Sequence, residues 1–284
     1  MLTTLTRPVH TDLTTLATVR GELNLAEPED ATELAVENAL LGRYIRQASQ
    51  AIVSATQRTW ARGSYRETAA GSWTQTLQLV HGWLLTHTPV MAIDQVLING
   101  APFTDYTVDD GAGILELSQS VGPWYPSWEG TFQIDYTAGY LLPSDDLTSN
   151  AISADAASNR LLHADAGFPL LVPGDVIVVS GFLPQANDGV ATVVSRTASQ
   201  LVLTGLTLDD APAAQDITLS VRTLPDDLEG ACVLAVRASY LSRQWALTGP
   251  RIIQAEGGTQ FLSMPSGALP KEARELLKPF MRVA

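Results

Sequence analysis

Apolar residues recur at helical spacing in the first sixty positions of the chain. A short stretch of this kind covers residues 11–25, and a longer one follows Asp30. Asp30 stands three residues before Glu33, the spacing of a capping box at a helix start. Across residues 31–60, apolar side chains three, four or seven positions apart fall on one stripe, which comprises Leu34, Leu41, Ile45, Ala48, Ile52 and Ala55. We therefore expect a long helix with one buried face.

A matching helical pattern covers residues 226–247. It starts at Asp226 with Glu229 three positions on and stops before Gly249 and Pro250. Its stripe comprises Leu228, Cys232, Ala235, Val236, Ser239, Tyr240 and Arg243. Two apolar stripes of similar length predict that the two long helices pack together, with Cys232 as a small core residue. A last short helix is expected from Pro270, a favoured first position, and weakens at Pro279.

Between these helices the hydrophobic period changes to two. Strand patterns occupy residues 76–80, 95–98, 113–117 and 131–136. The dipeptides Asn99-Gly100 and Asp110-Gly111 tolerate positive φ and are typical of tight hairpin turns. A small antiparallel sheet is the expected result.

Residues 148–222 form a second β-rich block, which contains no Glu and no Lys. Strand patterns recur at 175–180, 190–195, 200–204 and 217–221. Both flanks, residues 142–147 and 224–228, carry a Leu-Pro start with Asp-Asp-Leu, so a helix-start signal stands on either side of the block. We interpret the block as an insertion at a surface turn, where insertions are tolerated.

The expected fold class is α+β. A helical core with a small antiparallel sheet is predicted for residues 1–147 and 223–263, and an inserted all-β barrel or sandwich for 148–222. Residues 264–284 are predicted to form a C-terminal docking tail. With 284 residues and 45% apolar side chains, the chain can bury a sizeable core.

Charge and composition narrow the function classes. Thirty acidic and seventeen basic residues give a net charge of −13, which argues against binding nucleic acid through phosphate neutralisation. The apolar stretches are shorter than the roughly 20 residues of a membrane-spanning helix, and residues 1–10 lack the apolar core of a signal peptide. The single cysteine, Cys232, excludes an internal disulfide and a cysteine-based zinc site.

The last fourteen residues reverse the sign of the charge. Four basic side chains, Lys271, Arg274, Lys278 and Arg282, stand against Glu272 and Glu275. This segment carries +2 and leaves −15 on the rest of the chain. Two interpretations remain open, a solvated amphipathic helix and a basic tail that docks on an acidic partner.

No catalytic, cofactor-binding or metal-binding residues are predicted. His81 and His87 lack the spacing of a helical zinc site, and no nucleophile elbow, Walker loop or dinucleotide fingerprint occurs. The Asp pairs at 109–110, 209–210 and 226–227 occupy turn and cap positions, where Asp is expected for backbone hydrogen bonding. The sequence therefore predicts a protein that is not an enzyme and holds no cofactor.

Three aromatic residues crowd one Pro-bracketed loop, namely Trp124, Tyr125 and Trp128. Such rings pack back on the sheet, fill a subunit interface or stack on sugar rings. Back-packing is the default interpretation, an interface the second and sugar binding the third.

The order of these elements resembles the head-to-tail connector (adaptor) proteins of long-tailed phages. The resemblance rests on the short and long helices, the runs at 105–108 and 113–117, and a Trp-Pro region. It continues with residues 134–140 (Ile-Asp-Tyr-Thr-Ala-Gly-Tyr), which lead to Leu-Pro and Asp before a helix. It covers about residues 1–147 and 223–284, and the inserted block departs from the compact members of the family.

The resemblance implies a virion neck protein, assembled in the host cytoplasm, that forms a ring of typically twelve subunits. Its partners would be the portal and a head-closure (stopper) or tail-terminator protein, with DNA passing without specific binding and no membrane contact. The C-terminal segment would reach the portal. Lys271, Arg274, Lys278 and Arg282 would then face an acidic portal surface, with Leu276, Leu277 and Phe280 as the apolar anchor.

The alternative from a different class is a carbohydrate- or receptor-binding virion module, with the inserted block as the binder. A cell-wall hydrolase is disfavoured, because the chain shows no catalytic constellation.

Overall fold

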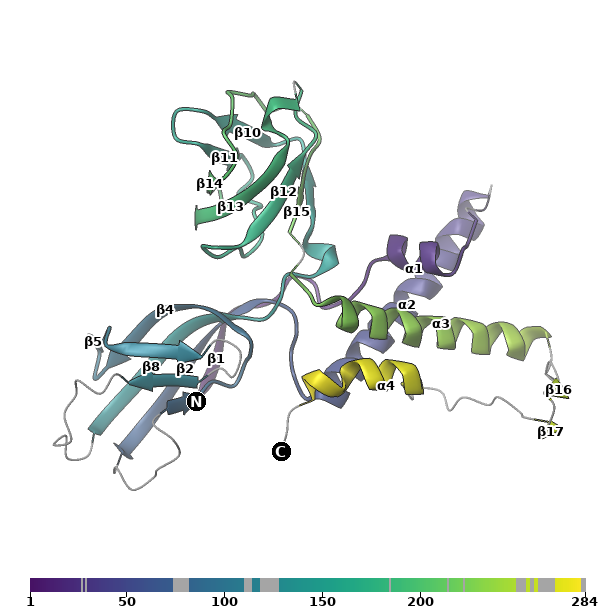
Figure 1. Cartoon of the computed structure of the whole chain (residues 1–284), viewed down its shortest axis with the longest axis horizontal. Helices are drawn as coiled ribbons and strands as arrows, with labels where there is room; N and C mark the ends of the chain where they lie inside the picture. The colour runs from purple at the N-terminus through teal and green to yellow at the C-terminus, as the bar shows by residue number, and fades with distance from the viewer. Residues whose placement is uncertain are drawn as a thin grey trace. The chain divides into compact units, whose positions relative to one another are not determined.

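The computed structural model describes most of the chain in two compact units (Figure 1). The sheet unit comprises Met1–Val9, Thr59–Leu141 and Asp145–Thr223, and the helical unit comprises His10–Arg58, Leu142–Ser144 and Leu224–Ala284. Helices and antiparallel sheets confirm the α+β class. The described residues are 1–26, 28, 30–73, 82–109, 114–117, 128–183, 185–213, 215–221, 223–248, 254–255, 258–259 and 269–281.

The described part of the helical unit contains four α-helices. They are α1 (Leu16–Glu22), α2 (Ala31–Thr56), α3 (Asp226–Thr248) and α4 (Lys271–Leu277), and a 3-10 turn (Lys278–Phe280) follows α4. All four were predicted, but α1 is shorter than residues 11–25. Helix α2 ends before the predicted Trp60, because Gln57 adopts a left-handed conformation with φ 54°.

The predicted helix starts differ in detail. Asp30 caps α2 as predicted, since its Oδ1 accepts a hydrogen bond of 2.7 Å from the Thr32 amide. Asp226 instead lies inside α3 as its first residue, and the Pro225 carbonyl accepts from the Leu228 amide at 3.0 Å. Glu229 accepts a bond of 2.9 Å from the Thr14 hydroxyl. The prediction of Asp226 as cap was therefore wrong by one position.

Helices α2 and α3 pack together, as their stripes predicted. Ser49 Oγ on α2 lies 3.6 Å from Cys232 Sγ on α3, and both residues are buried. Most of the predicted stripe is buried, but Ala55 is exposed and Thr56 is buried in its place. The core of this unit therefore joins segments that lie on either side of residues 148–222.

The sheet unit begins with a five-stranded antiparallel sheet in the order β1-β2-β8-β4-β5. Its strands are β1 (Leu2–Thr6), β2 (Gly63–Trp73), β8 (Trp128–Ala138), β4 (Val90–Ile98) and β5 (Ala101–Pro102). Next to it β3 (Gly82–Leu84), β7 (Ile114–Leu117) and β6 (Tyr106–Asp109) form a three-stranded sheet. Their shared core comprises Tyr65, Leu85, Val90, Val96, Leu115, Ile134, Tyr136 and Ala138.

The predictions for this part were uneven. Asn99 and Gly100 make the tight β4–β5 turn, with φ angles of 53° and 81°, which confirms the predicted hairpin. The predicted strand at 76–80 and the dipeptide Asp110-Gly111 lie outside the described residues. Strands β1 and β2 were not predicted.

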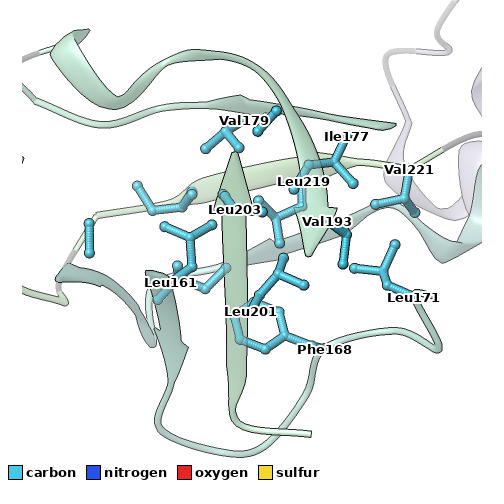
Figure 2. Packing of buried hydrophobic residues seen from close by; sticks show 14 of the residues in the cluster. Leu161, Phe168, Leu171, Ile177, Val179, Val193, Leu201, Leu203, Leu219 and Val221 are labelled. Atoms are coloured by element: carbon cyan, nitrogen blue, oxygen red, sulfur yellow. The ribbon is translucent and has the colours of Figure 1, made fainter. Parts of the chain in front are cut away.

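The third sheet is a curled, seven-stranded antiparallel sheet in the order β10-β11-β14-β13-β12-β15-β9. Its core is the large apolar cluster of Figure 2, to which Ile177, Val193, Leu203 and Leu219 contribute. The strands are β9 (Leu147–Ser149), β10 (Ile152–Asp155), β11 (Arg160–His163), β12 (Val176–Ser180), β13 (Gly189–Arg196), β14 (Gln200–Thr204) and β15 (Ile217–Ser220). A short ladder of β16 (Gln254–Ala255) and β17 (Gly258–Thr259) lies further along the chain.

The two ends of this β block lie side by side. The Leu141 amide donates to Thr223 Oγ1 at 2.8 Å, and the Thr223 amide donates to the Leu141 carbonyl at 3.2 Å. Asp146 accepts from the Val221 amide at 2.9 Å. Adjacent ends are what an insertion requires. The boundary at 148–222 remains a prediction, tested below by deletion.

Candidate functional site

Helix α4 carries most of the residues that the sequence assigned to portal binding. It begins after Pro270, and the Arg274 Nε donates to the Leu269 carbonyl at 2.9 Å across the first turn. Lys271, Arg274 and Lys278 are exposed, so their cations are available to a partner. Lys278 forms an exposed ion pair with Glu275 one turn earlier. Arg282 lies outside the described residues.

The three apolar residues of the predicted anchor divide into two groups. Leu276 and Phe280 are half-buried, whereas Leu277 is buried together with Ala273. Helix α4 packs on α3. Leu276 of α4 packs next to Gly230 of α3, because a Cβ added at Gly230 would lie 3.7 Å from Leu276 Cδ1. Leu277 therefore belongs to the core of the helical unit. The sequence did not indicate this burial, because the pattern alone placed Leu277 with Leu276 and Phe280 in the docking anchor.

The aromatic residues of the Pro-bracketed loop are Trp124, Tyr125 and Trp128. Trp124 and Tyr125 lie outside the described residues, and Trp128 is the first residue of β8. The three roles considered for these aromatic residues, namely back-packing, a subunit interface and sugar stacking, remain predictions.

A shallow acidic hollow lies on the helical unit, where the N-terminal turns of α2 meet the C-terminal part of α3. Its volume is about 440 Å³. The Tyr240 hydroxyl donates to Glu37 Oε1 at 3.4 Å at its margin. The lining residues are Asp30, Thr32, Glu33, Val36, Glu37, Leu40, Tyr240 and Arg243. Its carboxylates would favour a cationic side chain over an anion.

A buried polar network fastens residues 85–89 to the five-stranded sheet. The Tyr136 hydroxyl donates to Glu67 Oε1 at 2.5 Å, and the same oxygen accepts from the Thr86 amide at 2.7 Å. The His87 amide donates to the Tyr136 hydroxyl at 3.2 Å. The imidazole ring of His87 stacks on the ring of Tyr65, with 3.8 Å between the ring centroids. Burial, and then the bond to Glu67, raise the pKa of Tyr136 well above its ordinary value. This phenol stays neutral, as a structural hydrogen-bond donor does.

A second buried polar contact lies within the sheet unit. Arg62 Nη1 lies 2.5 Å from Asp175 Oδ2, and Nη2 lies 3.2 Å from Oδ1. Arg62 Nε also donates to the Gly139 carbonyl at 3.2 Å, and Asp175 accepts from the Val172 amide at 2.7 Å. No sequence pattern indicates this pair, since neither residue stands in a motif and 113 positions separate them.

Reactive chemistry is sparse in the described ranges. Among the described residues, no group of three His, Cys, Asp or Glu side chains is arranged to hold a metal ion. Burial raises the pKa of the Cys232 thiol to about 12, which suppresses the nucleophilic thiolate. Asp210 has a structural role at a turn, because its Oδ1 accepts a hydrogen bond of 2.8 Å from the Ala156 amide. None of the described helices is long and apolar enough to cross a membrane.

Comparison with known proteins gives matches among solved structures only. No family model matches the chain, and no curated protein does. A chain from the neck of an empty GTA particle is 25% identical over 51% of this chain and 76% of that chain, with a TM-score of 0.35. A chain from the virion of a native gene transfer agent particle is 22% identical over 51% and 77%, with a TM-score of 0.35.

A third match covers the whole chain. It is a chain from the neck of a native GTA particle, 15% identical over 100% of this chain and 96% of that chain, with a TM-score of 0.32. All three TM-scores lie below 0.5.

Proposed function

We propose that this chain is a structural subunit of a ring in the neck of a tailed phage or phage-like particle. The ring joins the portal to a head-closure or tail-terminator protein and lets DNA pass. The observation that carries the proposal is the helical unit, in which α2 and α3 pack together although residues 148–222 lie between them. The same order of short helix, long helix, hairpins and second long helix underlies the resemblance to the connector family.

The run at residues 134–140 supports this proposal with a physical reason for its glycine. Strand β8 ends at Ala138, and Gly139 has φ +95°. A Cβ at Gly139 would lie 2.6 Å from the Ala61 carbonyl oxygen, which no side chain tolerates. Trp60 and Ala61 meet this turn directly, since the Tyr140 amide donates to the Trp60 carbonyl at 2.7 Å. The run therefore determines that β8 ends at Ala138 and that the chain turns at Gly139.

Portal docking is assigned to the exposed side of α4. Lys271, Arg274 and Lys278 supply positive charge on a chain of net −13, and half-buried Leu276 and Phe280 supply adjoining apolar surface. Each exposed ion pair contributes only about 0–1 kcal/mol. The apolar contacts would therefore provide most of the affinity, and the charges mainly orientation and association rate.

The acidic composition suits a DNA conduit. A ring of chains that each carry −13 offers few cations to phosphates, so DNA would slide without being held.

The alternative, glycan binding by the inserted block, receives no support from the aromatic residues. Stacking on sugar rings requires exposed aromatic side chains. Residues 148–222 contain no Trp and no Tyr, and their two phenylalanines, Phe168 and Phe182, are buried in the sheet core.

Electron microscopy of the purified chain, alone and mixed with portal-bearing heads, tests the proposal. Rings that attach at the portal vertex are expected, whereas a chain that never assembles on heads would overturn it. Reversal of the exposed charges, Lys271→Glu, Arg274→Glu and Lys278→Glu, should weaken attachment more at low salt than at high salt. The matched control reverses Arg7 and Arg46, which are exposed basic residues outside α4.

Truncation after Ser263 is a less specific test than the sequence suggested. It removes Leu277 and Ala273, whose burial holds α4 on α3. Loss of attachment in the truncated chain could therefore come from the missing docking residues or from a destabilised helical unit. The charge reversals separate these two causes, because they leave Leu277 in place.

A further inference from the structure

The outer face of the seven-stranded sheet is aliphatic and exposed. Val176 and Val178 on β12, and Val190 and Val194 on β13, have exposed fractions between 46% and 59%. Val178 and Val190 are direct cross-strand partners, and Val176 is opposite Thr192. We call the outer face of strands β14, β13, β12, β15 and β9 the valine face. It comprises Gln200, Val202, Thr204, Val190, Thr192, Val194, Ser195, Val176, Val178, Ser180, Thr218, Ser220 and Thr148.

The valine face carries no charged side chain. Its residues are Val, Thr and Ser with one Gln, Gln200, on a chain whose net charge is −13. Charges adjoin it at two margins. Arg160 on β11 is the cross-strand partner of Val202 and forms an ion pair with Asp155, and Asp146 accepts a hydrogen bond of 3.0 Å from Ser220. Two of its hydroxyls form a hydrogen bond with each other, since Thr148 Oγ1 and Thr218 Oγ1 lie 3.0 Å apart.

The fold itself does not need these valines. The alternate residues of the same strands, Ile177 and Val179 on β12 and Ala191 and Val193 on β13, fill the core of the curled sheet. The outward valines are not members of that core cluster. An exposed apolar patch on adjacent strands marks an interaction surface, because isolated exposed hydrophobic residues are common but contiguous ones are not.

We propose that the valine face is covered by the valine face of a second copy of this chain. Two such faces stack as sheets do in a β-sandwich, about 10 Å apart with branched side chains interdigitating. Like-charged chains repel, and a face without charge is where two copies of a −13 chain approach at least cost. A cationic partner would instead select the acidic surfaces, and a glycan would require exposed aromatic rings.

This pairing goes beyond the proposed neck ring and does not depend on it. Ring closure requires two different surfaces on each subunit, whereas two valine faces meet across a two-fold axis. The two contacts are therefore measured separately, one by ring images and the other by a probe on the valine face.

A cysteine on the valine face provides that probe. Cys232 is buried, so Val190→Cys introduces the only accessible thiol. A bismaleimide with a span of about 10 Å, the spacing of stacked sheets, should link two copies of the full-length Val190→Cys chain at micromolar concentration. The control is Val36→Cys on α2, where the exposed fraction is 67% but no valine adjoins it. It should give at least tenfold less crosslinked product.

Val178→Lys, combined with Val190→Cys, tests whether the crosslink reports packing. Lysine lowers the net negative charge, so a tenfold or greater loss of crosslinking cannot arise from general repulsion between acidic chains. Val36→Lys in the same background should leave crosslinking unchanged. Circular dichroism and the melting temperature should match the parent, since all three positions are exposed.

The outcomes separate the two proposals. Rings without a Val190→Cys crosslink would leave the neck ring standing and overturn the pairing of valine faces. A crosslink without rings would support the pairing and count against the ring. Equal crosslinking at Val36→Cys, or no effect of Val178→Lys, would show random collision and also overturn the pairing.

Discussion

Arg62 and Asp175 form a two-pronged, buried ion pair within the sheet unit, with N···O distances of 2.5 and 3.2 Å. Arg62 directly precedes β2, and Asp175 directly precedes β12 of the seven-stranded sheet. Arg62 also donates to the Leu170 carbonyl at 3.3 Å. The pair therefore ties the predicted insertion to the start of the five-stranded sheet, and it is satisfied on both sides by further hydrogen bonds.

Removing one member of this pair should destabilise the protein strongly. Arg62→Met or Asp175→Leu leaves the other charge buried without its partner, at a cost of about 3–5 kcal/mol. The double variant removes both charges and should recover much of that loss. A double-mutant cycle in chemical denaturation measures the coupling. Additive single effects would show that the two residues act independently.

Gly139→Ala should be far more costly than an ordinary glycine substitution. The added methyl would meet the Ala61 carbonyl at 2.6 Å in a left-handed backbone conformation, so we expect a loss of about 2–4 kcal/mol. Gly21→Ala in α1 is the matched control, because its Cβ meets nothing within 4 Å and its helix favours Ala. Thermal unfolding of both variants tests this, and equal melting temperatures would contradict it.

The Tyr136–Glu67 bond predicts a loss of stability at alkaline pH. The folded state raises the pKa of Tyr136 above its unfolded value of about 10. The stabilisation from the neutral phenol is therefore complete below pH about 10 and is lost as pH rises through the folded value. Tyr136→Phe should abolish this part of the alkaline slope. At neutral pH it should cost about 1–3 kcal/mol, because buried Glu67 loses a donor.

Denaturant titrations between pH 7 and 11 measure this slope. Tyr44→Phe on α2 serves as the control and should keep the slope of the parent. A Tyr136→Phe variant with an unchanged slope would show that the network does not determine alkaline stability.

A charge placed between α2 and α3 should disrupt the helical unit. Ile45→Asp or Val236→Asp buries an unpaired carboxylate and should cost several kcal/mol, about 3 or more. Val36→Asp at an exposed position of α2 should change stability by less than about 1 kcal/mol. Melting curves followed by helical circular dichroism distinguish these cases, and parent-like melting of Ile45→Asp would refute the packing.

Deletion of the β block tests the predicted domain boundary. Asp146 lies beside Val221 through a 2.9 Å hydrogen bond, so a short Gly-Ser linker from Leu147 to Thr223 can replace residues 148–222. The remainder should keep its helical circular dichroism and unfold cooperatively, with Arg62 then exposed to water. An insoluble or unfolded product would place the boundary elsewhere.

Local patterns in the sequence determined the elements that depend on local physics. The spacing of Leu41, Ile45 and Ile52 predicted the buried face of α2, and the stripe through Cys232 predicted its partner α3. Asn99 and Gly100 predicted their turn, because few other residues adopt positive φ without strain. The exposed cations Lys271 and Arg274 of α4, for which portal binding is a proposal, were also found from the sequence, since charge reversal along a chain is visible without a structure.

Tertiary pairing decided what those patterns left open. Residues 176–179 read Val-Ile-Val-Val, a continuous apolar run that does not indicate which side faces the core. The register of β12 with β13 and β15 buries Ile177 and Val179 and leaves Val176 and Val178 exposed. Leu277 and the Arg62–Asp175 pair were decided in the same way, because burial and long-range ion pairing depend on neighbours far away in the sequence. The spacing of apolar residues therefore predicts the type of an element, whereas the residues that bury it are determined by tertiary packing.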